Sequence, residues 1–399
     1  MVTRDLTTGI KPESSKRGFA LVITSHALNH TYDSLYPILY PSMISELDLS
    51  YGLIGVLAMG YRLFSGALQL VMGFLGRFVR RKILLGLGMI WQCTANSTAA
   101  FGQGFEHIFI SRSLAGVGSS PQHPTSAAYI AETFSKERIG RALGINIAAA
   151  MMGSFLAPFL GTLVLTTVGW RNTILAFSVP GFLLGIAFLF MRESKRSQKW
   201  SGGSTFSYMY MGLREVLTNR TVVAVMILEA VMAFRIGARD FLPSFFVHDL
   251  AMTSLESGIV FTVFVAVGIP APYFWGYLSD RLDRRKVVVL SMSMAAALWY
   301  ALAYATDIVQ LLVVLLPIGF VGQGIGGVVQ AFVAESTTKE NRDLIYGIYF
   351  TLSFTLGSLS AVILGYLADG FGFQACFIWV AIVSFLTVVA AAILLRQRS

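Results

Sequence analysis

The stretch that decides the fold is residues 276–286, GYLSDRLDRRK, a cluster of charges between two long apolar runs. A related stretch, GFLGRFVRRK, occupies residues 73–82, which is 203 residues earlier. A second pair of similar stretches, AETFSKERIGRALGI at 131–145 and AESTTKENRDLIYGI at 334–348, has the same offset. Because two pairs share one spacing, we interpret the chain as a tandem duplication of one unit.

The composition places both units in a lipid bilayer. Hydrophobic residues make up 55% of the chain and charged residues 13%, and the mean hydropathy of +0.68 exceeds that of soluble domains. About 20 apolar residues span the hydrocarbon core. The sequence has twelve such runs, at 19–41, 51–74, 83–101, 107–132, 141–166, 172–191, 220–247, 256–279, 287–305, 308–335, 344–368 and 373–395. We therefore predict an all-α membrane protein with 12 transmembrane helices.

The duplication divides these helices into two pseudo-symmetric six-helix bundles. We predict an N-terminal bundle at 1–192, a polar linker at 193–219 and a C-terminal bundle at 220–399. A unit with an even number of spans enters the membrane twice from the same side, so the repeats are parallel and can rock about a site at their interface. The short loops leave no room for a catalytic domain. We expect neither enzymatic activity nor a cofactor, and no metal site.

The basic residues favour one side of the membrane. Of the 30 Lys and Arg residues, 25 fall on the side that holds both termini. By the positive-inside rule both termini are cytoplasmic, in a multi-pass protein of the cell membrane. We interpret the net charge of +9 as a sign of topology and of contact with anionic membrane lipids, not of nucleic-acid binding. We expect the chain to act as a monomer. Cys93 and Cys376 lie in apolar runs and are expected to be inert thiols.

The repeated loop resembles the signature of the major facilitator superfamily, Gly-x-x-x-Asp-Arg/Lys-x-Gly-Arg/Lys-Arg/Lys. The second copy matches at five positions: Gly276, Asp280, Arg281, Arg284 and Arg285. The first copy matches at three: Gly73, Arg81 and Lys82. The resemblance implies that these residues form a cytoplasmic gate with Glu132 and Glu335. Since Arg77 stands where the motif has its aspartate, the second copy is expected to contribute more to the gate.

Two further patterns narrow the resemblance. Arg112, Gly116 and Gly118 fit the fourth-span pattern Arg-x-x-x-Gly-x-Gly of the superfamily. Three residues resemble its fifth-span antiporter motif, which is commoner in exporters: Gly153, Pro158 and Gly161. The stretches LNHTYDSLYP at 28–37 and GVGSSPQHPTS at 116–126 are similar to the fosmidomycin-resistance branch.

Ionisable residues inside apolar runs are costly and indicate functional sites. In the first run His26, His30 and Asp33 step by four and three, which places them on one helix face. Pro37 continues this face, where a break in the helix is expected. We predict that Asp33, assisted by His30 and His26, takes up the coupling proton. The alternative is that the histidines only form hydrogen bonds between helices.

The remaining charged residues of the runs indicate substrate binding. Guanidinium groups suit carboxylates and phosphonates, so the arginines favour an anionic substrate. The alternative is internal ion pairing, such as Arg62 with Glu229, or Arg235 or Arg239 with Asp33. Gln122 and His123 precede Pro124, which removes a backbone donor near a possible cavity. The candidate substrate residues are Arg62, Arg112, Gln122, His123, Glu229, Arg235, Arg239 and Asp240.

Together these features predict a secondary active transporter that moves a small anionic or amphiphilic organic compound by alternating access. Its partners are this small molecule and protons. The antiporter-like residues favour proton-coupled efflux, and the resemblance implies fosmidomycin-like substrates. Two alternatives stay open: a symporter that imports an organic anion, and a receptor of similar fold that does not transport.

Overall fold

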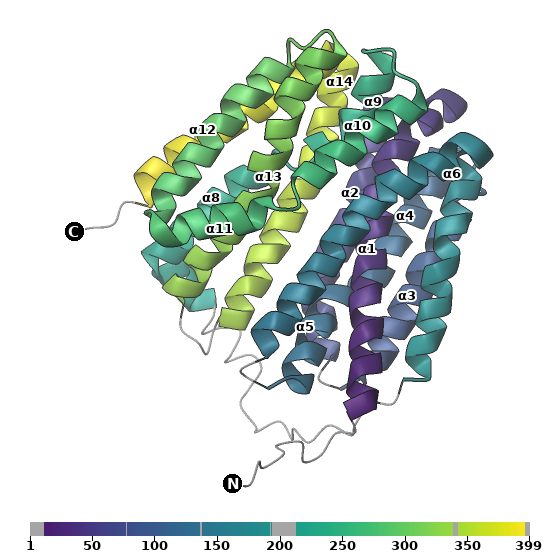
Figure 1. Cartoon of the computed structure of the whole chain (residues 1–399), viewed down its shortest axis with the longest axis vertical. Coiled ribbons are helices and arrows are strands. Elements are labelled where there is room, and N and C mark those ends of the chain that lie inside the picture. The colour runs from purple at the N-terminus through teal and green to yellow at the C-terminus, as the bar shows by residue number, and fades with distance from the viewer. Residues whose placement is uncertain are drawn as a thin grey trace, which may run out of the picture.

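A computed structural model describes residues 12–76, 78–135, 138–191, 193, 213–337 and 342–395. All regular structure in these residues is helical, which confirms the predicted all-α class (Figure 1). The helices of the first half are α1 (Pro12–Leu47), α2 (Tyr51–Leu75), α3 (Arg81–Ala99), α4 (Phe105–Ser119), α5 (Gln122–Thr133) and α6 (Ile139–Leu189). Those of the second half are α8 (Arg220–Ala233), α9 (Ala238–His248), α10 (Ser254–Val267), α11 (Ala271–Arg281), α12 (Arg284–Leu302), α13 (Ile308–Ser336) and α14 (Arg342–Leu394).

Glycine kinks separate two predicted runs inside each of the two longest helices. Gly169 in α6 has φ 79° and Gly372 in α14 has φ 76°. A glycine adopts such a backbone conformation without steric cost, so the chain can reverse there without a longer loop. The two kinks lie 203 residues apart, the same offset as the repeated loops.

Other predicted runs are interrupted. The run at 107–132 breaks into α4 and α5, the run at 220–247 into α8 and α9, and the run at 256–279 into α10 and α11. By contrast, α1 continues through Pro37 and Pro41. The break expected at Pro37 is therefore wrong. Breaks in transmembrane helices matter because they leave backbone and side-chain groups available for substrates and ions.

The described residues contain seven segments that are long and apolar enough to cross a membrane. Two of them, Ile139–Leu189 and Leu344–Leu394, each have 51 residues and contain a glycine kink. Either segment is therefore long enough for two crossings of about 20 residues. The count of twelve spans stays a prediction.

The two halves lie side by side, with α1–α6 in purple to blue-teal and α8–α14 in teal through green to yellow (Figure 1). They meet where α2 packs on α14, α1 on α9 and α6 on α10. We name the end that carries Arg81 and Arg284 the basic end, and the end that carries Tyr51 and Asp369 the opposite end. Most of the predicted linker lies outside the described residues. Of its described part, Glu193 accepts hydrogen bonds from the backbone of Arg81 and Lys82.

At the opposite end, α2 and α14 touch backbone to backbone. A Cβ atom on Gly55 would lie 2.3 Å from the Ala361 carbonyl oxygen, and one on Gly365 would lie 2.3 Å from that of Tyr51. The Asp369 carboxylate accepts hydrogen bonds from the backbone N–H groups of Tyr51 and Gly52, at 2.8 and 2.7 Å. These donors belong to the first two residues of α2, so Asp369 caps the N-terminus of a helix of the other half. We call this contact the α2–α14 seam.

Candidate functional site

An ionic cluster of side chains from α1, α2 and α9 joins the two halves. Arg62 of α2 binds both carboxylate oxygens of Asp240 in α9, with Nη2 at 2.8 Å from Oδ1 and Nη1 on Oδ2. Asp33 of α1 lies 3.7 Å from Arg62, a looser pair. The Asp33 side chain is 31% exposed and that of Asp240 only 2%. Asp33 is thus the carboxylate of this cluster that solvent can reach.

Arg239 adds a second cation to this cluster. It extends from the first turn of α9 across to α1, where Nη2 donates to the Ser34 hydroxyl at 2.8 Å. Its buried Nε–H has no hydrogen-bond partner among the described residues. The cluster of Arg62, Arg239, Asp33 and Asp240 therefore balances two positive and two negative charges. The structure brings these four predicted residues together, which sequence spacing could not show.

Internal ion pairing, the alternative to substrate binding, is present for Arg62, with partners other than the example given from the sequence. Arg62 binds Asp240 and Asp33 and not Glu229. The described hydrogen bond of Arg239 is to Ser34. The physical reason for the Arg62–Asp240 pair is the break between α8 and α9. It places Asp240 in the first turn of α9, where its backbone position favours a carboxylate.

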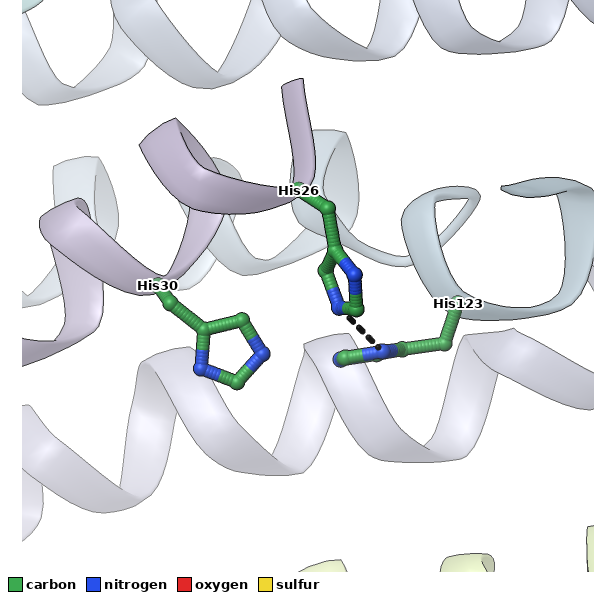
Figure 2. Close-up of side chains that lie close together, drawn as sticks. All are labelled: His26, His30 and His123. Carbon is green, nitrogen blue, oxygen red and sulfur yellow. Dashed lines mark hydrogen bonds between the residues drawn. The ribbon is translucent and has the colours of Figure 1, made fainter. Parts of the chain in front are cut away.

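Three histidines form a second cluster beside α1. His26 and His30 of α1 face His123, which stands in the first turn of α5 (Figure 2). His26 Nε2 lies 3.2 Å from His123 Nδ1, and His26 Nδ1 lies 3.0 Å from the Asn146 carbonyl oxygen. The ring centroids of His30 are 5.0 Å from His26 and 5.4 Å from His123. We predicted a role for each histidine but not that they would meet.

Gln122 and Arg112 point into the first half. The Gln122 amide donates to Ser25 and Ser126 and so joins α5 to α1. Arg112 is 1% exposed and lies between two aromatic rings, with its guanidinium carbon 3.4 Å from the Tyr36 centroid and 4.2 Å from that of Tyr61. A substrate could reach Arg112 only if one of these tyrosines moved.

Glu229 and Arg235 line a separate cavity of about 190 Å³ in the second half, between α8, α13 and α14. Tyr349 donates to Glu229 at 2.7 Å. The Gln323 side-chain nitrogen and Arg235 Nε, both buried, have no hydrogen-bond partner in the part of the chain that the structure describes. This cavity therefore offers both an acceptor and spare donors to a small polar molecule.

Comparison with known proteins gives the family. The sequence profile of the Major Facilitator Superfamily matches residues 22–238 and 239–399. The chain belongs to this superfamily. It is therefore a membrane-spanning transporter and not an enzyme.

The relatives of this transporter are distant. The fosmidomycin resistance protein of Escherichia coli K12 is 24% identical over 86% of this chain and 84% of its own length. A probable L-galactonate transporter of the same organism is 23% identical over 81% of this chain and 76% of its own. Among solved structures, a bacterial homolog of the human lysosomal transporter Spinster superposes with a TM-score of 0.86 at 14% identity, covering 98% of this chain and 99% of the other. This last likeness shows the shared fold.

The signature loops of the superfamily stabilise the basic end of each half. Arg81 binds Glu132 through Nε at 2.8 Å and through Nη2, and Arg284 binds Glu335 at 2.7 Å. Lys82 donates to the carbonyls of Leu189 and Met191 at the end of α6, and Arg285 donates to that of Ala392 near the end of α14. These contacts repeat at an offset of 203 residues. Each lies within one half, so a role in closing a gate between the halves stays a prediction.

The other gate residues are less engaged. Asp280 lies 3.3 Å from Arg284. Arg281 stacks on Tyr277, with 4.4 Å between the guanidinium carbon and the ring centroid. Gly73 lies in the last turn of α2, and Gly276 lies in the middle of α11. Arg77 lies outside the described residues.

We expect Glu335→Gln to slow transport more than Asp280→Asn, by about 2- to 5-fold for the first and little for the second. Glu335 makes three hydrogen bonds with Arg284, whereas the Asp280 side chain is 69% exposed and makes one loose contact. Initial rates in proteoliposomes at equal protein content would measure the difference. An Asp280 variant slower than the Glu335 variant would contradict this ranking.

The antiporter-like residues pack α6 against α1. A Cβ atom on Gly153 would lie 1.9 Å from the Ala27 carbonyl oxygen, and one on Gly161 would lie 2.5 Å from a Leu35 methyl carbon. Pro158 is buried in the same helix. The motif therefore has a packing role in this structure.

Sequence reasoning missed a buried polar network in the first half. Ser119 lies at its centre and contacts Asn29 at 2.9 Å, Tyr61 at 3.1 Å and Ser65 at 3.1 Å. Gln92 donates to Tyr61 at 3.1 Å. The available signal is polar residues within apolar runs, but neutral amides and hydroxyls are less costly in a membrane than charges and so give a weaker indication of a site.

Proposed function

We propose that this chain is a proton-coupled secondary transporter of a small organic anion, with its basic end in the cytoplasm. The observation that carries the proposal is the ionic cluster of Arg62, Arg239, Asp33 and Asp240, which crosses between the two halves. Substrates of transporters with this duplicated architecture bind near the bilayer midplane at the repeat interface. Because its residues come from both halves, this site should change its geometry when the halves move to open one end of the protein or the other.

The charge balance of the cluster couples binding of a proton to binding of an anionic substrate. With both carboxylates ionised, two cations face two anions, and an added anionic substrate gives the site a negative excess. Protonation of one carboxylate removes that excess and frees guanidinium donors for the substrate. Asp33 suits this step because its side chain is the more exposed carboxylate and its pairing with Arg62 is loose, at 3.7 Å. Proton and anion should therefore bind together.

Co-binding favours transport of the proton and the anion in the same direction. The relative described as a probable L-galactonate transporter supports an organic acid as substrate. Export in exchange for protons is the second candidate function. The antiporter-like residues of α6 and the similarity to the fosmidomycin resistance protein favour it.

Transport into proteoliposomes with an imposed pH gradient tests the proposal. We expect labelled galactonate or fosmidomycin to accumulate inside when the outside is acidic, and proton uptake to accompany it. The control is the same vesicles with the gradient collapsed by a protonophore. Substrate uptake driven by an acidic interior would support exchange instead. Flux that ignores the gradient in both directions would disprove proton coupling.

A further inference from the structure

The histidine cluster has the features of a metal site. One ligand nitrogen from each of His26, His30 and His123 can be chosen so that all three lie within 4.8 Å of one another. Zinc-like ions bind imidazole nitrogens at about 2.0–2.1 Å, which puts two ligands of a tetrahedral ion roughly 3.3 Å apart. The 3.2 Å between His26 Nε2 and His123 Nδ1 already matches this spacing. Since the three nitrogens lie within 4.8 Å of one another, closing the site around an ion needs side-chain movement of roughly 1.5 Å at most, which ring rotations supply.

The hydrogen bond on the far side of His26 prepares it as a ligand. A backbone carbonyl can only accept, so the Asn146 oxygen at 3.0 Å requires a hydrogen on His26 Nδ1. In the neutral ring Nε2 then carries a lone pair that points toward His123. Metal-bound histidines are commonly fixed in this way, by donating their second ring N–H to a carbonyl or carboxylate.

We propose that His26, His30 and His123 bind one divalent transition-metal ion of the Zn²⁺ and Co²⁺ class. Three nitrogen ligands suit these ions, whereas Mg²⁺ and Ca²⁺ require oxygen ligands. Three protein ligands leave one coordination position open for water or an anion. The site borders the other half, since the His123 ring lies 6.2 Å from that of Phe354 in α14. The proposal rests on this geometry alone and not on the proposed transport function.

Metal binding in this site must compete with protons. Each imidazole binds a metal only in its neutral form, so affinity should fall in acid. Without metal, a hydrogen on His123 Nδ1 can bridge to His26 Nε2. When an ion binds His123 Nδ1, this hydrogen moves to Nε2 of the same ring, which gives the other neutral tautomer.

The test uses the full-length protein purified in detergent, with any affinity tag removed, and Co²⁺ as the probe. We expect one Co²⁺ per chain, the intense visible absorption of a tetrahedral ion, and displacement by Zn²⁺. His123→Ala and His30→Ala should weaken binding by at least about 100-fold. The matched control, His107→Ala, changes a histidine near the end of a span and should bind as the native protein does.

Size-exclusion elution and thermal unfolding establish that each variant is folded. If His123→Ala does not fold, His30→Ala decides, because the described contacts of its ring are ring packing and not hydrogen bonds. An adventitious surface ion would give weak binding that survives both changes, and this outcome overturns the proposal. So does an octahedral spectrum. Since no substrate or gradient is used, failure here would be distinct from failure of the transport proposal.

Discussion

Replacing Arg62 with glutamine should lower the initial transport rate by more than about 100-fold. Arg62 in α2 of one half forms a bidentate salt bridge with Asp240 of the other half. Removing one partner of a buried pair leaves an uncompensated charge and costs roughly 3–5 kcal/mol. The Asp240 side chain is only 2% exposed, so solvent cannot replace the lost cation. Counterflow exchange in proteoliposomes, which needs no gradient, measures this loss directly.

Two comparison variants separate the role of Arg62 from its effect on folding. The double variant Arg62→Gln, Asp240→Asn removes both charges, so we expect its thermal stability to recover while transport stays low. Arg171→Gln removes an arginine whose partner, Glu46, is 49% exposed within the same half, and it should transport almost normally. A single Arg62 variant with more than about a third of the native exchange rate would show that the cluster is not the substrate site.

The Asp33→Asn variant should lose accumulation driven by a pH gradient and keep counterflow exchange. Asparagine preserves the size of the side chain but cannot take up a proton. The Arg62–Asp240 bond stays in place, so the path for substrate should remain. We therefore expect substrate inside the vesicles to reach only the outside concentration, a loss of at least about tenfold in accumulation, with rates independent of pH.

Asp307→Asn is the matched control for Asp33. Asp307 caps the first turn of α13 through Val309 and Gln310, at an exposed position, and its change should leave accumulation intact. Equal loss of exchange and accumulation in Asp33→Asn would point to substrate binding instead of proton coupling. Full accumulation by this variant would move the coupling proton to another group.

Periodic features of the sequence predicted the fold class well. Apolar runs and the 203-residue repeat depend on local spacing, and the structure preserves that spacing in the kinks at Gly169 and Gly372 and in the pairs of Arg81 and Arg284. Helix continuity was harder to predict. Pro37 lies inside a continuous helix, whereas the break before α9 comes at residues 234–237, which contain no proline. Packing by neighbouring helices decides whether a helix continues or breaks, and the sequence of a single apolar run does not show this packing.

The sequence predicts which residues belong to the candidate site but not how their side chains are arranged. Asp33, Arg62, Arg239 and Asp240 were all chosen because charge is costly in a bilayer. Their partners depend on how the two halves pack, so spacing along the sequence does not show that Arg62 pairs with Asp240 and not with Glu229. The meeting of His123 with His26 and His30 is likewise a product of three-dimensional packing across 97 and 93 residues of sequence.

The α2–α14 seam has a consequence for leakage. At Gly55 and Gly365 the contact that would keep water and ions from passing between α2 and α14 is made by one main chain against another. A barrier of long side chains can open partly, one rotamer at a time, and let water or ions pass. Two backbones in contact have no such intermediate, because packed interfaces tend to switch between discrete states. Separation there should therefore be all-or-none, and the protein should hold back protons at this end until both halves move as bodies.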